Sequence, residues 1–256
     1  MRRLARSLVA LAISWPGLAR AADLEFLPEL RLRLSGARYA PAERDFQWVA
    51  WMGGGASFLR AGRVTAFGSA DVETVVGNER RGFDANQANY HLEVGIAREV
   101  GRRRLAVFFN HVSRHAQDRP KPQAVDWNTL GARLSGTLAE RPLPLRFELS
   151  AGHTTLASLV GYRFEGVLGL EADLVKRPRH ALYLLARARA VTTEASAEFP
   201  RDGFLDLRLE TGARTERGGR VFQGFLAFER RNDVYLVVPG ARERALLGIR
   251  FSLEGR

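Results

Sequence analysis

The chain has 256 residues, of which 46% are hydrophobic and 26% charged, and it carries a formal net charge of +11 without a cysteine. The missing cysteines exclude a fold held together by disulfide bonds. No stretch after the first residues approaches the roughly 18 to 20 uninterrupted apolar residues that a membrane-spanning helix needs.

The first 21 residues have the pattern of a secretory signal peptide. Three early arginines precede the apolar run SLVALAISWPGL, and Ala19-Arg20-Ala21 is the small-x-small pattern that signal peptidase accepts. We expect cleavage after Ala21, which leaves residues 22–256 as a single domain outside the cytoplasm. Because an exported chain rarely meets nucleic acid, the arginine-rich composition favours phosphate-bearing lipid as the anionic partner.

From residue 24 onward, hydrophobic and polar residues alternate, which is the period of a strand with one apolar face. Leu30-Arg31-Leu32-Arg33-Leu34 is a short example, and hardly any stretch has the spacing of a helix. We expect about twelve strands, at residues 24–34, 46–59, 63–75, 89–100, 103–113, 126–138, 143–153, 163–175, 181–192, 204–215, 220–230 and 245–254.

The connections between these strands alternate between short and long. Tight breaks such as Ala61-Gly62 and Gly218-Gly219 alternate with longer polar segments at 35–45, 76–88, 114–125, 154–162, 193–203 and 231–244. An even number of strands with short turns on one side and long loops on the other is typical of outer-membrane barrels. We therefore predict an all-β fold, a transmembrane antiparallel up-and-down barrel in the bacterial outer membrane, with short periplasmic turns and longer extracellular loops.

The last predicted strand agrees with this fold. The segment 248–253, GIRFSL, resembles the glycine-plus-alternating-apolar signal on the final strand of outer-membrane barrels, although Glu254-Gly255-Arg256 follow where an aromatic residue usually ends the chain. We expect the barrel insertion machinery to be a partner. The oligomeric state stays open.

In a membrane barrel the apolar face of each strand meets lipid and the charged face lines the lumen. The alternation assigns equal numbers of arginines and carboxylates to the lumen, with Arg33, Arg163 and Arg189 among the arginines and Glu73 and Glu165 among the carboxylates. We therefore expect a charge-lined lumen that is near neutral, cross-linked by ion pairs, and narrow or closed.

One segment concentrates reactive side chains at the extracellular end of the strand 103–113. Residues 108–121, FFNHVSRHAQDRPK, contain two of the five histidines. His111, Ser113 and His115 are each two residues apart, so on a strand they form one polar row.

The next strand brings a carboxylate to this row. A connection centred near residue 120 places Asp126 roughly opposite Ser113. A serine, a histidine and a carboxylate are the parts of a nucleophile–base–orienter triad, in which His111 would accept the proton of Ser113 and Asp126 would hold the imidazole.

The pair His111-Val112-Ser113 resembles the His-x-Ser pair of an outer-membrane lipid A deacylase family, which faces lipid and has a glutamate about a dozen residues further on. Asp126 stands near that glutamate's position and is one methylene shorter, and the barrel of that family is smaller. The resemblance implies a serine-dependent lipid hydrolase with lipopolysaccharide as a partner.

A longer resemblance, over about 35 residues, is to an uncharacterised bacterial envelope family with the pattern His-x-Ser-Ser-His-Leu-Gly-Asp after an Asn-x-x-Tyr strand and a basic turn. The matching parts are residues 86–90, the arginines at 102–104, and the run from His111 to Asp118. Arg114 replaces the second serine and Gln117 the glycine. This resemblance implies a barrel and leaves its chemistry open.

Two orientations of the polar row are open. Residues 105, 107 and 109 share its parity, which would aim the row at lipid and suit lipid hydrolysis. A β-bulge at Phe108-Phe109 would instead turn the row into the lumen. There the row would have a structural role: it would form hydrogen bonds to the connection that follows, with Asp118 and Arg119 folding over it.

A metal site is a weaker interpretation of the same residues than the two roles above. His111, His115 and Asp118 have side chains that zinc accepts, but residues four apart on a strand are separated by roughly 13 Å. We expect neither a metal nor a cofactor.

Two functions are compatible with these features. We favour a non-catalytic envelope role, as a narrow porin-like pore or as a barrel that interacts with lipopolysaccharide. The alternative is a serine-dependent outer-membrane lipid hydrolase that uses Ser113, His111 and Asp126.

Overall fold

The computed structural model describes residues 24–78, 80–116, 125–140, 142–196, 199–232 and 241–255, so the predicted signal peptide at 1–21 lies outside the described residues. The described residues contain no helix long and apolar enough to cross a membrane. Their strands are β1 (Leu24–Glu43), β2 (Phe46–Ala61), β3 (Val64–Gly77), β4 (Asp84–Val100), β5 (Arg103–Ala116), β6 (Val125–Ala139), β7 (Leu145–Ala157), β8 (Gly161–Lys176), β9 (His180–Glu194), β10 (Gly203–Arg217), β11 (Arg220–Arg231) and β12 (Arg242–Gly255).

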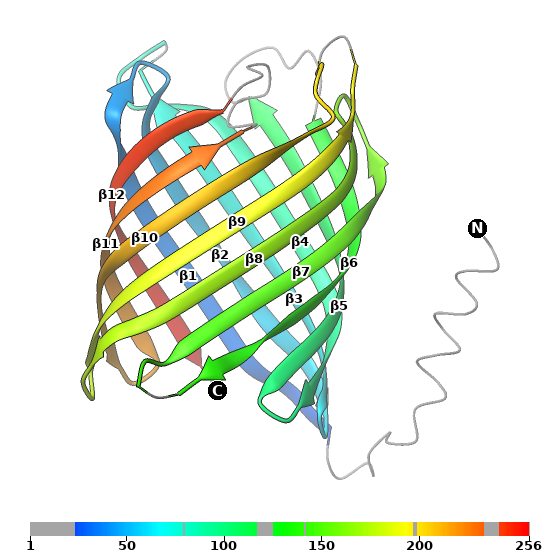
Figure 1. The fold of residues 1–256 in the computed structure, drawn as a ribbon, viewed down its shortest axis with the longest axis vertical. Helices are drawn as coiled ribbons and strands as arrows, with labels where there is room; N and C mark the ends of the chain where they lie inside the picture. Colours follow the sequence, from blue (N-terminus) through cyan, green and yellow to red (C-terminus); the bar gives the residue numbers. More distant parts are fainter. Residues whose placement is uncertain are drawn as a thin grey trace, which may run out of the picture.

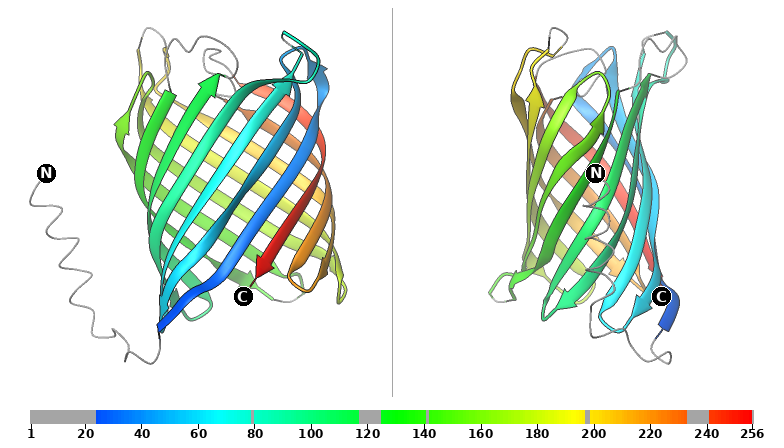
Figure 2. Two further views of the ribbon diagram at one scale, coloured as in Figure 1. Left: turned by 180° about the vertical axis from the view of Figure 1, so that it is seen from behind. Right: turned by 90° about the vertical axis from the view of Figure 1, so that its right-hand side faces the viewer.

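These strands form one closed antiparallel barrel (Figure 1). Each strand pairs with its neighbours in the chain, and β1 pairs with β12 in a register that runs from Leu30 opposite Gly255 to Ala40 opposite Ala245. The strands are tilted around the whole circumference, as the two further views in Figure 2 show. The all-β, up-and-down barrel predicted from the alternating pattern is thus confirmed.

Each strand runs past at least one of its predicted ends, and β1 does so furthest. The segment 35–45 was expected to be a loop, but β1 continues to Glu43, and β7 continues to Ala157. Ala37 and Tyr39 explain the longer β1, because both are buried inside the barrel and continue the inward face of the strand beyond Leu34.

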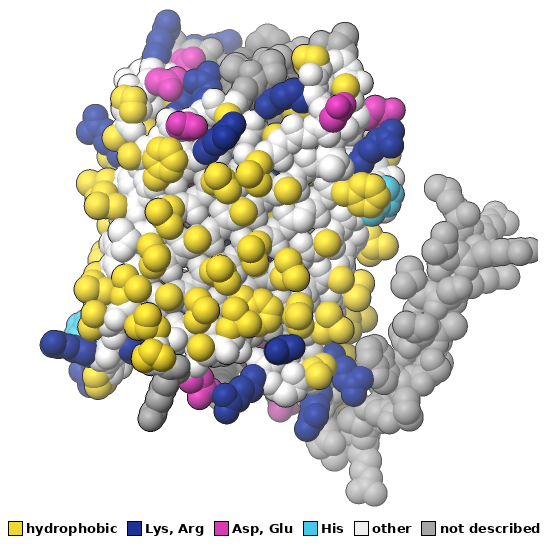
Figure 3. Space-filling view, in the orientation of Figure 1, with side chains coloured by type: hydrophobic (Ala, Val, Ile, Leu, Met, Phe, Trp, Pro, Cys, Tyr) yellow, Lys and Arg dark blue, Asp and Glu magenta, His cyan; other side chains and the backbone are white. Residues whose placement is uncertain are grey.

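The outward face of the barrel is apolar. Leu92, Val94 and Ile96 on β4 are each about half exposed, and alternate residues of the other strands repeat this arrangement. On the face drawn in Figure 3, hydrophobic side chains form a band between two rims of charged residues. A band of this kind is the surface that meets the hydrocarbon of a bilayer.

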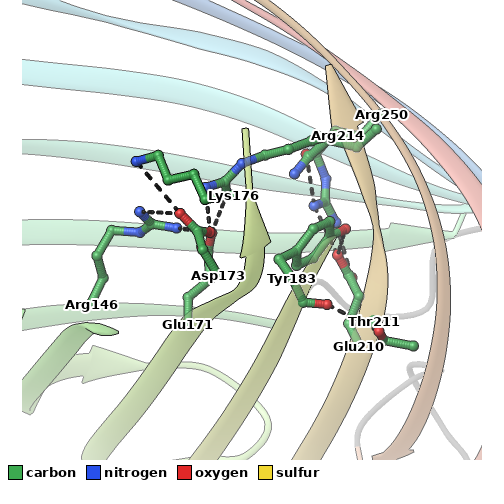
Figure 4. Close-up of polar contacts among 10 residues, drawn as sticks. Arg146, Glu171, Asp173, Lys176, Tyr183, Glu210, Thr211, Arg214 and Arg250 are labelled. Atoms are coloured by element: carbon green, nitrogen blue, oxygen red, sulfur yellow. Dashed lines mark hydrogen bonds and ion pairs between the residues drawn. The ribbon is translucent and has the colours of Figure 1, made fainter. Parts of the chain in front are cut away.

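The inward face carries ion pairs. Arg146 Nη2 lies 2.6 Å from Glu171 Oε1 and 2.8 Å from Asp173 Oδ1, and Arg214 contacts the same two carboxylates (Figure 4). Arg163 is an exception to the predicted lining. The ladder between β8 and β9 shifts register between Tyr162 and Phe164, so Arg163 is exposed, where it pairs with Glu194.

The half of the lumen nearer the longer, extracellular connections is filled by side chains. One apolar cluster joins β1, β2, β3, β9, β11 and β12 and includes Tyr39, Phe46 and Leu246. Glu73 on β3, which is fully buried, bonds to Arg231 on β11, so an ion pair joins two non-adjacent strands through the interior. The interior is thus packed at this end.

Candidate functional site

The polar row on β5 faces outward. The ladders of β5 with β4 and with β6 are continuous through Phe108 and Phe109, so the bulge considered above is absent from β5. His111, Ser113 and His115 therefore share a face with Val107 and Phe109, whose side chains are 51% and 39% exposed on the apolar band. The row stands at the extracellular end of this lipid-facing wall.

Two short hydrogen bonds organise the row. The hydroxyl oxygen of Ser113 and Nε2 of His115 are 2.6 Å apart and share a hydrogen bond. The Nδ1–H of His111 donates to Oδ1 of Asn128 on β6 at 2.7 Å. Tyr90 on β4 lies opposite Ser113, and its ring meets that of His115 edge-on with centroids 5.5 Å apart. Ser113 therefore lies between two imidazoles, each of which a hydrogen bond keeps in place.

These contacts differ from the predicted triad. Asp126 does lie directly opposite Ser113. However, the histidine bonded to Ser113 is His115 rather than His111, and the partner of His111 is Asn128 rather than Asp126. The hydrogen bonds found for Asp126 join its backbone to Ser158. The contacts differ because the ladder places Asn128, and not Asp126, opposite His111.

Sequence reasoning missed Asn128 because it looked for a carboxylate. The signal was present, since Asn128 is two residues after Asp126 and therefore lies on the same face of β6. Asp118 and Arg119, which were also singled out, lie outside the described residues. Within the described segments, no three His, Asp or Glu side chains are close enough to hold a metal ion.

The strands that carry the row are supported from inside the barrel. Val112, Val125 and Trp127 alternate with the outward residues and belong to a buried cluster with Tyr162. The rings of Trp127 and Tyr162 have centroids 4.3 Å apart, and the guanidinium of Arg114 lies 5.1 Å from the Trp127 ring. Packing behind the site fixes the backbone from which the reactive side chains project.

The arrangement brings a hydroxyl and an imidazole to one face of β5, and these are the groups that acyl transfer uses as nucleophile and general base. A neutral His111 that donates through Nδ1 has an unprotonated Nε2, which is the atom a general base uses. Ser113 is two residues away on the same face, at roughly 6.6 Å between Cα atoms. Ser113 and His111 thus project from alternate positions on one face of β5, and the hydrogen bond found for the Ser113 hydroxyl is to His115.

No protein-family model matches the chain, and no curated protein matches it. Several solved bacterial outer-membrane proteins resemble it in fold. An outer-membrane channel from Pseudomonas putida F1 superposes with a TM-score of 0.57 at 10% identity, covering 94% of this chain and 99% of that one. Outer membrane phospholipase A from Escherichia coli gives 0.54 at 8% identity, with 89% and 97% covered. LpxR from Salmonella typhimurium gives 0.50 at 9% identity, with 87% and 99% covered.

Identities this low show the fold alone. Together with the closed barrel and its apolar outer band, they establish the class: the protein is a twelve-stranded β-barrel of the bacterial outer membrane.

Proposed function

We propose that this barrel is a serine-dependent hydrolase of outer-membrane lipids. Ser113 is the nucleophile, His111 the general base, and Asn128 the positioning residue that holds His111 in its reactive tautomer. The observation that carries the proposal is the place of Ser113 on the outward face of β5 between His111 and His115, where it is 9% exposed and its hydroxyl is hydrogen-bonded to His115.

The chemistry follows from these positions. The Oγ of Ser113 forms a bond to the carbonyl carbon of an acyl ester while Nε2 of His111 takes the hydroxyl proton. The same imidazole returns the proton to the departing alcohol oxygen, which leaves an acyl-enzyme and a lysolipid. Water activated by His111 then releases the fatty acid. His115 holds the hydroxyl of Ser113 in the resting enzyme.

The solved structures support this proposal only through their similar fold. A phospholipase is among the solved barrels with a TM-score above one half, so this architecture is compatible with hydrolysis of membrane lipid. The phosphate and acyl groups of phospholipid or of lipopolysaccharide are the expected substrate chemistry. Barrel insertion machinery is proposed as a partner only during assembly.

The test uses the protein refolded in detergent with mixed micelles of outer-membrane lipids, analysed by mass spectrometry. Wild type should release fatty acid, and Ser113→Ala should not. Ser135→Ala on β6, whose side chain faces inward, is the matched control and should behave as wild type. A long-chain alkyl fluorophosphonate should form a covalent bond to Oγ of Ser113 with loss of fluoride. Lipids that stay intact with wild type would reject the proposal.

A second candidate function is a narrow pore. The charged inward face and the similarity to a channel barrel favour it, whereas the packed extracellular half of the lumen opposes a wide path. A pore predicts a bilayer conductance that survives Ser113→Ala. A hydrolase with a closed lumen predicts no conductance and a turnover that this variant abolishes.

A further inference from the structure

Two neighbouring turns at the periplasmic end of the barrel, the lower end in Figure 1, carry exposed arginines. The turn between β8 and β9 is closed by Arg177 and His180, whose backbones exchange two hydrogen bonds. The turn between β10 and β11 is closed by Arg217 and Arg220, which lie directly opposite each other. Together these four residues are termed the turn patch. The two turns are adjacent, because His180 lies opposite Thr215 in the β9–β10 ladder.

The arginines that close the second turn project on the lipid side of the wall. Arg217 has the parity of Thr215 on β10, and Arg220 has that of Phe222, which is 52% exposed on β11. The ladder between these strands is regular throughout, so no bulge changes this assignment. Glu216, the carboxylate next to Arg217 in the sequence, has the opposite parity and belongs to the lumen side.

The charges of the turn patch are not neutralised by the protein. Within the described residues, no carboxylate lies at ion-pair distance from the guanidinium of Arg177, Arg217 or Arg220. At the extracellular rim, by contrast, Arg242 pairs with Glu43 at 2.6 Å. Like charges directly opposite each other on a ladder are destabilising. The pair Arg217–Arg220 therefore favours an anion between its two side chains.

Towards the bilayer centre, the wall next to the turn patch is apolar. Leu182 on β9 is 50% exposed and Ile249 on β12 is 58% exposed. Between them, Ala213 and Gly224 lie opposite each other, and a Cβ added to Gly224 would meet no atom within 4 Å. The surface thus offers arginines at the rim and small apolar residues beside them. An amphiphile with an anionic headgroup and a hydrocarbon chain matches both parts, whereas a soluble anion would use only the first.

We infer that the turn patch binds the phosphate of an anionic phospholipid in the periplasmic leaflet, with an acyl chain lying over Ala213 and Gly224. Arginine suits this role because its planar guanidinium can donate two parallel hydrogen bonds to one phosphate. A phosphate bound between Arg217 and Arg220 removes the repulsion between them. The turn patch lies at the other end of the barrel from Ser113, so this inference is independent of hydrolysis.

Photo-cross-linking tests the site in a bilayer. The folded barrel is reconstituted into phosphatidylcholine vesicles with a minor share of phosphatidylglycerol that carries a photoactivatable group near its phosphate. Cross-links should map to residues 177–180 and 213–222. Arg217→Gln/Arg220→Gln should lower their yield by about tenfold, since two basic side chains near an anionic membrane surface contribute an affinity of this order. Absence of cross-links to these segments in wild type would overturn the inference.

Arg63→Gln/Arg103→Gln is the matched control. Both arginines are exposed on other periplasmic turns, and within the described part of the chain they also have no carboxylate partner. This variant removes the same charge and should keep the cross-links at 213–222 within about twofold of wild type, because charges more than a Debye length away are screened. Equal losses in the two variants would mean that net charge alone attracts the lipid, which would also overturn the inference.

A stability measurement separates a lipid from a soluble anion. Phosphatidylglycerol added to the barrel in non-ionic detergent should raise the unfolding temperature of wild type, because a ligand that binds only the folded state stabilises it. It should not raise that of Arg217→Gln/Arg220→Gln. Glycerophosphoglycerol, the same headgroup without acyl chains, should have little effect at equal concentration. An effect as large as that of the lipid would assign the turn patch to soluble phosphate esters and overturn the lipid inference.

Discussion

The imidazole of His111 and the side-chain amide of Asn128 meet across the β5–β6 ladder, with Nδ1 and Oδ1 2.7 Å apart on the lipid-facing wall. This bond selects the tautomer whose Nε2 can accept a proton. It gives an amide the role that sequence reasoning had assigned to a carboxylate.

Removing that amide should affect the chemical step more than substrate binding. For Asn128→Ala we expect kcat to fall about 100-fold with KM almost unchanged, because a mispositioned general base loses a contribution of this order. Asn128→Asp should recover part of the rate, since a carboxylate also accepts from Nδ1–H. Steady-state kinetics on lipid micelles measures both. A rise in KM at constant kcat would instead make Asn128 a binding residue.

The two histidines that flank Ser113 should differ in importance. His111→Gln is expected to lower kcat by about 100-fold or more, as loss of a general base does. His115→Gln should cost less than about tenfold, since it removes the resting partner of the hydroxyl. Rates of labelling by the alkyl fluorophosphonate should follow the same order. The reverse order would assign the base role to His115, the histidine that bonds to Ser113 in the structure.

Asp126 distinguishes the triad predicted from the sequence, in which it orients His111, from the proposed one, in which Asn128 does. Its carboxylate lies opposite Ser113, yet the bonded partner of His111 is Asn128. We expect Asp126→Asn to keep kcat within about threefold of wild type, because it removes a charge without freeing the imidazole. A loss as large as that of Asn128→Ala, measured in the same assay, would restore the carboxylate as orienter.

The fold could be predicted from the sequence because each strand of a barrel is marked by a local alternation of apolar and polar residues. Alternation and turn spacing placed every predicted strand on an observed one, and errors occurred where polar residues continue a strand, as at the end of β1. Such residues resemble a loop in sequence, and it is the pairing of β1 with β2 and β12 that keeps them extended.

The site was readable only in part, for a physical reason. Parity within β5 put His111, Ser113 and His115 on one face, and loop length brought Asp126 opposite Ser113. The choice between hydrogen-bond partners depends on side-chain rotamers and on the exact cross-strand neighbour, which no periodicity encodes.

The ion pair between Glu73 and Arg231 should be a main support of the closed lumen. Glu73 Oε2 is 2.6 Å from Arg231 Nη2 and also accepts from Asn89 Nδ2 at 2.6 Å, in a fully buried position. Glu73→Ala leaves the arginine charge without its partner, so we expect a loss of about 3–5 kcal/mol in the free energy of unfolding. Replacing both residues by methionine should cost much less, because no unpaired charge is left.

The pair Arg33–Asp71 is the matched control, since it also faces the lumen but its arginine side chain is 47% exposed. Asp71→Ala should cost less than about 1 kcal/mol, as exposed pairs do. Urea unfolding in detergent, followed by tryptophan fluorescence and by the gel shift of the folded barrel, measures all four proteins. Equal losses for Glu73→Ala and Asp71→Ala would mean that water reaches Glu73 and that the lumen is open at this end, which would favour the pore over the closed barrel.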